Sequence, residues 1–267
     1  MSIFRKIRKM IKKARKVQPD IYIVSYPKSG RTWLRFMLCR YLIEKYKIEK
    51  DVSLDLLEAT KLSGLPLTNF THDQTYMSLK LAYSEMVFNQ ERFGGKRVLF
   101  LGRDIKDTVV SAYHQATKRN IVFEGPISEF IKNEQFGVRK IVRFYQMWLE
   151  SKARPVEFAY LSYEQMHQDP SGVLKSALAF IGEKEIDENA VKNAVESGRF
   201  DNMRKIEQAV GSKSSSVLKP GDANDLNSFK TRKGLVGDYA SELSEEDIQY
   251  IDSTIEEAGL KSLMAGL

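Results

Sequence analysis

A short loop between an apolar run and a helical pattern carries the first residues whose types and spacing could do chemistry. Residues 25–30 read Ser-Tyr-Pro-Lys-Ser-Gly, with Lys28 two positions before Gly30. Gly30 lets the backbone approach a ligand, the amides of the following helix start are free for an anion, and Lys28 adds a positive charge. The loop predicts a phosphate or sulfate site. Taken alone it also fits an ordinary turn, and it lacks the GxxxxGK[ST] order of nucleotide kinases.

The elements that must position this loop follow from three apolar runs, each of which leads through a polar turn into a helical pattern. The expected strands cover 21–24, 98–101 and 156–161, and the expected helices cover about 32–46, 107–115 and 170–181. Strands that alternate with helices favour a three-layer α/β fold, with a central, mainly parallel sheet flanked by helices. Active sites of such folds gather at the carboxyl ends of the strands, where the polar turns lie.

The full string at 26–34, YPKSGRTWL, resembles the 5′-phosphosulfate loop of the sulfotransferases that use 3′-phosphoadenylyl sulfate (PAPS), whose usual form is YPKSGTTWL. The resemblance implies a P-loop-type fold. It also implies that one run of residues binds the co-substrate: Lys28, Ser29, Gly30, Arg31, Thr32 and Trp33. Arg31 is the departure from the pattern, since it replaces a threonine hydroxyl with a cation near the phosphosulfate.

Two further signatures follow in the family's order. Residues 99–111 match an apolar strand, an Arg-Asp turn and a serine, and the resemblance assigns Arg103 and Ser111 to the 3′-phosphate. An arginine at a strand end and a serine in the next helix can both donate to one phosphate. Residues 232–239, RKGLVGDY, are similar to RKGxxGDW. The resemblance implies that Arg232, Lys233 and Gly234 close over the same phosphate.

Three aromatic residues complete the nucleotide site that the resemblance implies. Tyr163 begins a Tyr-Glu segment, and Phe200 lies in a segment similar to the family's Ser-Phe-x-x-Met. Both would contact adenine, and Trp33 would complete the clamp. An ordinary core role for Phe200 remains an equal alternative.

A hydroxyl acceptor needs a base, and a histidine suits the task because its pKa lies near neutrality. The chain has three histidines: His72, His114 and His167. The family places its base in a Lys-Thr-His-Leu-Pro segment, and Phe-Thr-His-Asp-Gln at 70–74 occupies the matching position. We therefore assign the base to His72 and assistance of the leaving group to Lys28. His114 is interpreted as structural, and His167 is placed in a polar turn.

The charge balance separates the first residues from the rest. Of 42 Lys and Arg, eight lie in the first twenty residues with a single acidic residue, which leaves 34 basic and 34 acidic residues beyond them. Residues 1–18 also show apolar residues at helical spacing, which predicts a basic amphipathic helix. Such a helix can lie on an anionic membrane. Packing on the domain, or contact with a nucleic acid or protein partner, are the alternatives.

The remaining composition is typical of a globular protein. A hydrophobic fraction of 42% predicts a full core, and we assign residues 19–267 to a single domain with a mobile lid loop at 205–228. The neutral body argues against a nucleic-acid-coating protein. One cysteine and three dispersed histidines give no metal-site spacing. One cysteine and the lack of a secretory signal pattern favour the cytoplasm, with the helix at 1–18 leaving attachment to the inner membrane face open.

The sequence thus predicts an enzyme that moves the sulfuryl group from PAPS to a small-molecule, lipid or glycolipid hydroxyl and releases adenosine 3′,5′-bisphosphate (PAP), without a metal. A P-loop nucleotide or nucleoside kinase and a non-catalytic membrane adaptor are the alternatives. The family's dimer motif, KxxxTVxxxE, is not matched, since Ala240, Ser244, Glu245 and Gln249 stand at its positions. The oligomeric state and the identity of the acceptor stay open.

Overall fold

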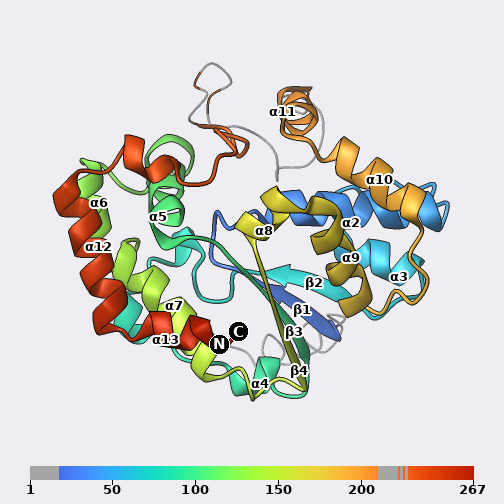
Figure 1. Cartoon of the computed structure of the whole chain (residues 1–267), viewed down its shortest axis with the longest axis horizontal. Coiled ribbons are helices and arrows are strands. Elements are labelled where there is room, and N and C mark those ends of the chain that lie inside the picture. Colours follow the sequence, from blue (N-terminus) through green and yellow to red (C-terminus); the bar gives the residue numbers. More distant parts are fainter. Residues whose placement is uncertain (1–17, 210–221, 223–224, 226–227) are drawn as a thin grey trace, which may run out of the picture.

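Four parallel strands form the central sheet of the protein. The computed structural model describes residues 18–209, 222, 225 and 228–267. The strands are β1 (Ile21–Val24), β2 (Thr68–Thr71), β3 (Arg97–Gly102) and β4 (Glu157–Ser162), and they lie in the order β2-β1-β3-β4 (Figure 1). The pairing register places Ile21 opposite both Thr68 and Arg97. The three predicted strands are confirmed to within one residue at each end. β2 was not predicted, because its sequence Thr-Asn-Phe-Thr contains no apolar run.

Helices cover both faces of this sheet, as the alternation of elements predicts. They are α2 (Arg31–Lys45), α3 (Leu56–Leu62), α4 (Gln90–Phe93), α5 (Ile105–His114), α6 (Ile127–Lys132), α7 (Val138–Glu150), α8 (Tyr163–Gln168), α9 (Pro170–Phe180), α10 (Glu188–Ser197), α11 (Phe200–Ala209), α12 (Glu245–Glu257) and α13 (Leu260–Ala265). The predicted helices correspond to α2, α5 and α9.

Alternate strand residues point to opposite faces, and two separate cores result. Val98 and Phe100 of β3 pack with residues of α5 and α7, whereas Leu99 and Leu101 pack with α2, α9 and α10. Figure 1 shows the two groups of helices on opposite sides of the sheet. The three-layer α/β architecture is therefore confirmed.

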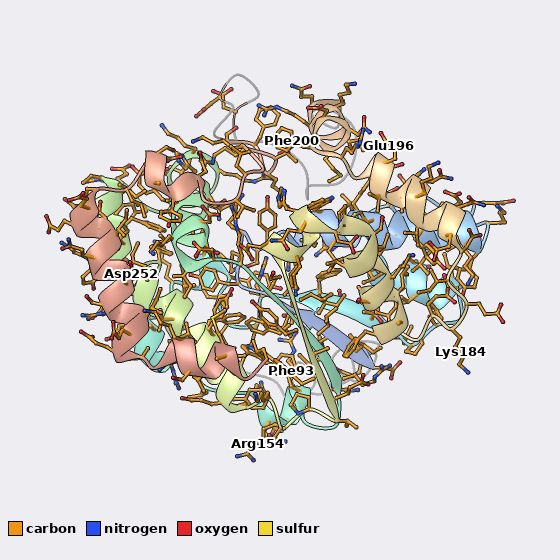
Figure 2. All side chains as sticks on the ribbon, viewed as in Figure 1. Phe93, Arg154, Lys184, Glu196, Phe200 and Asp252 are labelled. Atoms are coloured by element: carbon orange, nitrogen blue, oxygen red, sulfur yellow. The ribbon has the colours of Figure 1, made fainter. Side chains whose placement is uncertain are left out.

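Local signals fix the turns that follow the strands. Asp104 caps α5 by accepting a hydrogen bond from the amide of Asp107, and Ser162 and Gln165 form a reciprocal capping box at the start of α8. Each cap stops a strand and starts a helix at the carboxyl edge of the sheet. Phe200 lies toward this edge, whereas Phe93 lies at the opposite end (Figure 2).

Two sequence predictions fall largely outside the described residues. The basic segment at 1–17 is not described, and neither is most of the expected lid loop. The first part of that loop, residues 205–209, is helical because α11 continues to Ala209. Within the part of the chain that the structure describes, no helix combines the length and the apolar character that a membrane crossing needs.

Candidate functional site

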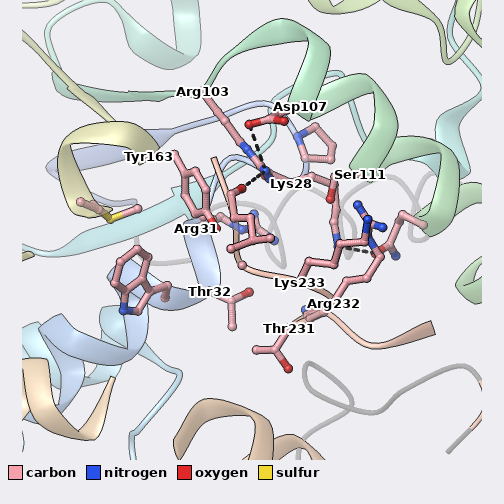
Figure 3. Close-up of a pocket in the computed structure, with 18 of the residues that line it drawn as sticks. Lys28, Arg31, Thr32, Arg103, Asp107, Ser111, Tyr163, Thr231, Arg232 and Lys233 are labelled. Atoms are coloured by element: carbon pink, nitrogen blue, oxygen red, sulfur yellow. Dashed lines mark hydrogen bonds and ion pairs between the residues drawn. The ribbon is translucent and has the colours of Figure 1, made fainter. Parts of the chain in front are cut away.

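A cavity of about 520 Å³ opens at the carboxyl ends of the strands (Figure 3). The loops after β1, β2 and β3, the start of α8, the start of α11 and the segment 230–239 all contribute to its wall. It is lined by all but one of the predicted site residues: Lys28, Gly30, Arg31, Thr32, Trp33, His72, Arg103, Ser111, Tyr163, Phe200, Arg232, Lys233 and Gly234. The exception is Ser29, whose side chain is buried and whose hydroxyl has no partner among the described residues.

The loop after β1 contains two residues with positive φ angles. Lys28 and Gly30 have φ angles of 77° and 81°, in the left-handed region. A Cβ on Gly30 would lie 2.5 Å from Cδ2 of Tyr163, so only glycine fits there. Gly30 is also the N-cap of α2, and no side chain caps that helix. The first amides of α2 therefore remain available for an anion.

Lys28 is held in strongly positive surroundings. Its Nζ lies 3.4 Å from Oε1 of Gln115, and its carbonyl oxygen accepts a hydrogen bond of 3.0 Å from Arg103. Burial, together with the positive charges of Arg119 and Arg103, lowers the pKa of Lys28 to about 7. A bound anion would offset these effects and keep the ammonium group charged.

Arg103 connects the second signature to the aromatic wall. Its guanidinium lies 4.2 Å from the centre of the Tyr163 ring, and Nη2 lies 3.7 Å from a carboxylate oxygen of Asp107. Asp107 also accepts hydrogen bonds of 2.8 and 3.1 Å from the amides of Gly237 and Tyr239. Asp107 therefore fastens the segment 232–239 beside Arg103, so that the second and third signatures face one site.

Arg232 and Lys233 are neutralised by two carboxylates in this structure. Glu242 lies 2.6 Å from Arg232 and 3.1 Å from Lys233, and Asp238 lies 2.6 Å from Lys233. Although burial acts in the opposite direction, hydrogen bonds with His114, Arg232 and Lys233 lower the pKa of Glu242 to about 2. A phosphate at this place would share both cations with Glu242 and Asp238.

Lys230 and Glu207 belong to the site although no sequence motif marks them. Lys230 lines the cavity, and burial together with the charges of Arg119 and Lys28 lowers its pKa to about 6. Glu207, which is fully buried, accepts hydrogen bonds from the amide of Lys230 and from the amide and hydroxyl of Thr231. In the sequence, the indication that Glu207 is buried is its position four residues after Met203, because this spacing places both residues on the same face of a helix.

The aromatic wall contains a residue that was not predicted. The ring centre of His167 lies 4.6 Å from that of Tyr163 and 5.0 Å from that of Trp33. His167 belongs to the last turn of α8 and lines the cavity, and does not lie in a polar turn as the sequence predicts. Phe200 packs against Gly234, where a Cβ would approach it to 2.5 Å.

His72 lies directly after β2, at the edge of the cavity. Its Nδ1 is 2.8 Å from the carbonyl oxygen of Ser25. Because a carbonyl only accepts hydrogen bonds, Nδ1 carries the proton and Nε2 keeps a free lone pair. Burial and the charge of Arg31 lower the pKa of His72 well below its usual range. The imidazole is therefore neutral, with the lone pair of Nε2 available, although the lowered pKa also makes it a weaker base than a free histidine.

His114 does not line the cavity and instead lies 2.5 Å from a carboxylate oxygen of Glu242, in agreement with a structural role. Over the residues that the structure describes, no group of three or more His, Cys, Asp and Glu side chains could hold a metal ion.

Comparisons with known proteins agree on one family. A family model described as a sulfotransferase domain matches residues 18–266. The chain is 26% identical over 260 residues to flavonol 3-sulfotransferase of Flaveria bidentis, a match that covers 89% of this chain and 81% of the relative. It is also 26% identical over 261 residues to cytosolic sulfotransferase 17 of Arabidopsis thaliana, with coverage of 89% and 73%.

Solved structures show the same fold. The crystal structure of a mouse sulfotransferase complexed with PAP superposes with a TM-score of 0.58 at 22% identity, covering 90% of this chain and 83% of the mouse chain. A retinol dehydratase in complex with retinol and PAP gives a TM-score of 0.58 at 17% identity, with coverage of 94% and 86%.

Proposed function

The chain belongs to the sulfotransferase family, and from this premise we propose that it transfers the sulfuryl group of PAPS to a hydroxyl-bearing acceptor and releases PAP. One observation carries the proposal. Two anion sites, the loop at 28–32 and the group formed by Arg103, Ser111 and 232–234, line a single cavity with a neutral histidine at its edge. A nucleotide with charged groups on both its 5′ and 3′ positions matches this arrangement.

The loop after β1 would hold the phosphosulfate. The amides at the start of α2 and the Thr32 hydroxyl donate to its oxygens, and Lys28 lies beside the bond that breaks. The acceptor oxygen attacks sulfur in line, and a new O–S bond forms as the bond from sulfur to the bridging oxygen breaks. The hydroxyl proton passes to Nε2 of His72. Lys28 neutralises the negative charge that collects on the leaving PAP.

The other cavity walls would hold the rest of the nucleotide. Arg103, Ser111, Arg232, Lys233 and the amide of Gly234 would bind the 3′-phosphate by charge-assisted hydrogen bonds. Trp33, Tyr163 and Phe200 would contact the adenine. Support comes from the position of these side chains around one cavity and from the PAP complexes of the structurally similar proteins.

The acceptor class and the place of action extend the proposal. Relatives whose names include flavonol and cytosolic sulfotransferases favour a small-molecule hydroxyl acceptor in the cytosol. The basic pattern of residues 1–18 supports contact with an anionic membrane surface, in which case a lipid or glycolipid acceptor would lie within reach. Residues 1–17 lie outside the described residues, so this part of the proposal rests on the sequence.

The experiment compares nucleotide binding with turnover. PAP should stabilise the folded protein against heat, and His72→Ala should keep PAP affinity while it lowers single-turnover sulfuryl transfer by about 10²–10⁴-fold. His72→Gln serves as the matched control, because a glutamine can keep a hydrogen bond to Ser25 but cannot act as a base. Stabilisation by ATP and Mg²⁺ but not by PAP would instead favour a kinase. Full PAP binding without transfer to any hydroxyl compound would favour an adaptor.

A further inference from the structure

The cavity holds more positive charge than its own carboxylates balance. Seven cationic residues line it: Lys28, Arg31, Arg103, Arg199, Lys230, Arg232 and Lys233. Asp107 and Asp238 are the acidic residues among the described lining, and both already form ion pairs with Arg103, Arg232 or Lys233. The proposed function assigns four of the cations to the nucleotide. Arg199 pairs with Glu196 at the surface. Arg31 and Lys230 remain without an assigned ionic partner.

Arg31 lies on the side of the cavity where the base lies. Its charge is the largest electrostatic cause of the lowered pKa of His72. Although burial acts in the opposite direction, hydrogen bonds with Thr71 and His72, together with the charge and a hydrogen bond of Arg31, lower the pKa of Tyr76. The Tyr76 ring in turn lies 5.4 Å from the His72 ring, edge to face. Arg31, His72 and Tyr76 therefore form one wall of the cavity. Figure 3 shows the position of Arg31 in the pocket. Among the described residues no carboxylate forms an ion pair with Arg31.

Lys230 adds a second basic side chain to this wall. The buried carboxylate of Glu207 accepts a hydrogen bond of 2.6 Å from its backbone amide, which holds the backbone of Lys230 at the cavity wall. Burial lowers the pKa of Lys230, and the positive charges of Arg119, Lys28, Arg31 and Arg35 lower it further. No ion pair joins Lys230 to a carboxylate in the described part of the chain. A guanidinium and an amine whose charged form is costly to bury therefore face the place where an acceptor must meet His72.

Resting on the proposed function, we propose that the acceptor carries an oxyanion, either a carboxylate or a phosphate, near the hydroxyl that is sulfated, and that Arg31 and Lys230 bind this group. A neutral acceptor would leave the Arg31 guanidinium without a counter-charge and would offer nothing that favours the charged form of Lys230. An oxyanion would pair with the guanidinium and ammonium groups and would orient the nearby hydroxyl toward Nε2 of His72. The side chain of Arg31 thus serves the acceptor, while its backbone stays part of the phosphosulfate loop.

The test measures acceptor binding to the full chain saturated with PAP. The probes share one ring: 4-hydroxybenzoate, 4-hydroxyphenyl phosphate and the neutral methyl 4-hydroxybenzoate. We expect at least one charged probe to bind about tenfold or more tightly than the ester, the usual size of a charge-assisted hydrogen bond. Comparison of the two charged probes separates a carboxylate site from a phosphate site. An ester that binds as tightly as both charged probes, or charged probes that do not bind, overturns the proposal.

Variants locate the effect. Arg31→Thr, which installs the family's usual residue, should reduce the preference for the charged probe about tenfold, and Lys230→Met should reduce it in the same direction. Arg31→Lys should retain part of it. Arg199→Thr removes another lining cation and should leave the preference unchanged. If Arg31→Thr weakens PAPS and the charged probe equally, Arg31 serves the phosphosulfate and the proposal fails.

This outcome is distinct from failure of the proposed function. If PAP does not bind, the proposed function itself is wrong. If PAP binds and a neutral phenol is sulfated more efficiently than its charged counterparts, the enzyme assignment stands and only the anionic acceptor is refuted.

Discussion

Lys28 should take up a proton when PAP binds, and the pKa values of the free protein set the size of the effect. With a pKa of about 7, Lys28 is roughly three-quarters neutral at about pH 7.5. Lys230, with a pKa of about 6, is almost wholly neutral there. The phosphates of PAP raise both values, because negative charge favours the ammonium form. Binding should therefore take up about 0.7 proton if only Lys28 responds, and about 1.7 if both lysines become charged.

Calorimetry of PAP binding in buffers with different heats of ionisation measures this number. Uptake should fall toward about 0.1 proton from Lys28 near pH 6, where that lysine is already charged. Between about pH 7 and 8, where the phosphates of PAP are fully ionised, PAP affinity should decrease as the pH rises. Lys28→Met should remove about 0.7 proton at pH 7.5. Net proton release by the wild type at pH 7.5, or the same uptake in Lys28→Met, would refute the electrostatic description of the loop.

Three further perturbations test the support around the site. Gly234→Ala should weaken PAP binding, because a Cβ there would lie 2.5 Å from Phe200. Gly64 has a similar φ angle but open space around it, so Gly64→Ala should cost only about 1 kcal/mol of stability. Equal PAP affinities of the two variants would contradict this expectation. Glu207→Gln should lower the free energy of unfolding by about 1–3 kcal/mol and weaken PAP binding, and unchanged values in denaturant titration and calorimetry would contradict a fastening role. Deletion of residues 1–18 should keep PAP binding and abolish sedimentation with phosphatidylserine vesicles, and equal sedimentation would refute membrane contact.

Much of the fold was predictable from the sequence, because apolar runs and helical spacing report burial directly. β1, β3 and β4 show such runs, and the polar turns after them lead to the cavity. β2 is not predicted from the sequence, because two of its four residues are threonines and it contains no apolar run. Both threonines are nevertheless buried in the structure. The position of His72 consequently rested on family resemblance, and the structure explains it as the residue that follows β2.

The site was predictable where short motifs mark it and not where tertiary contacts create it. The residues of the three signatures come together around one cavity. Lys230 could not be singled out, since its importance depends on the buried carboxylate of Glu207, about twenty positions earlier in the chain. His167 was misjudged for a similar reason. Its ring contacts with Tyr163 and Trp33 depend on how α8 packs against α2.

Acceptor-dependent release of PAP from PAPS is the most direct test of the central claim. The wild type, supplied with PAPS and a panel of neutral and anionic hydroxyl compounds, should form PAP and one sulfated product in equal amounts. His72→Ala should bind PAP with unchanged affinity and form product at least about a hundredfold more slowly. A wild type that binds PAP but sulfates no member of the panel, or a His72→Ala variant with full activity, would contradict the account.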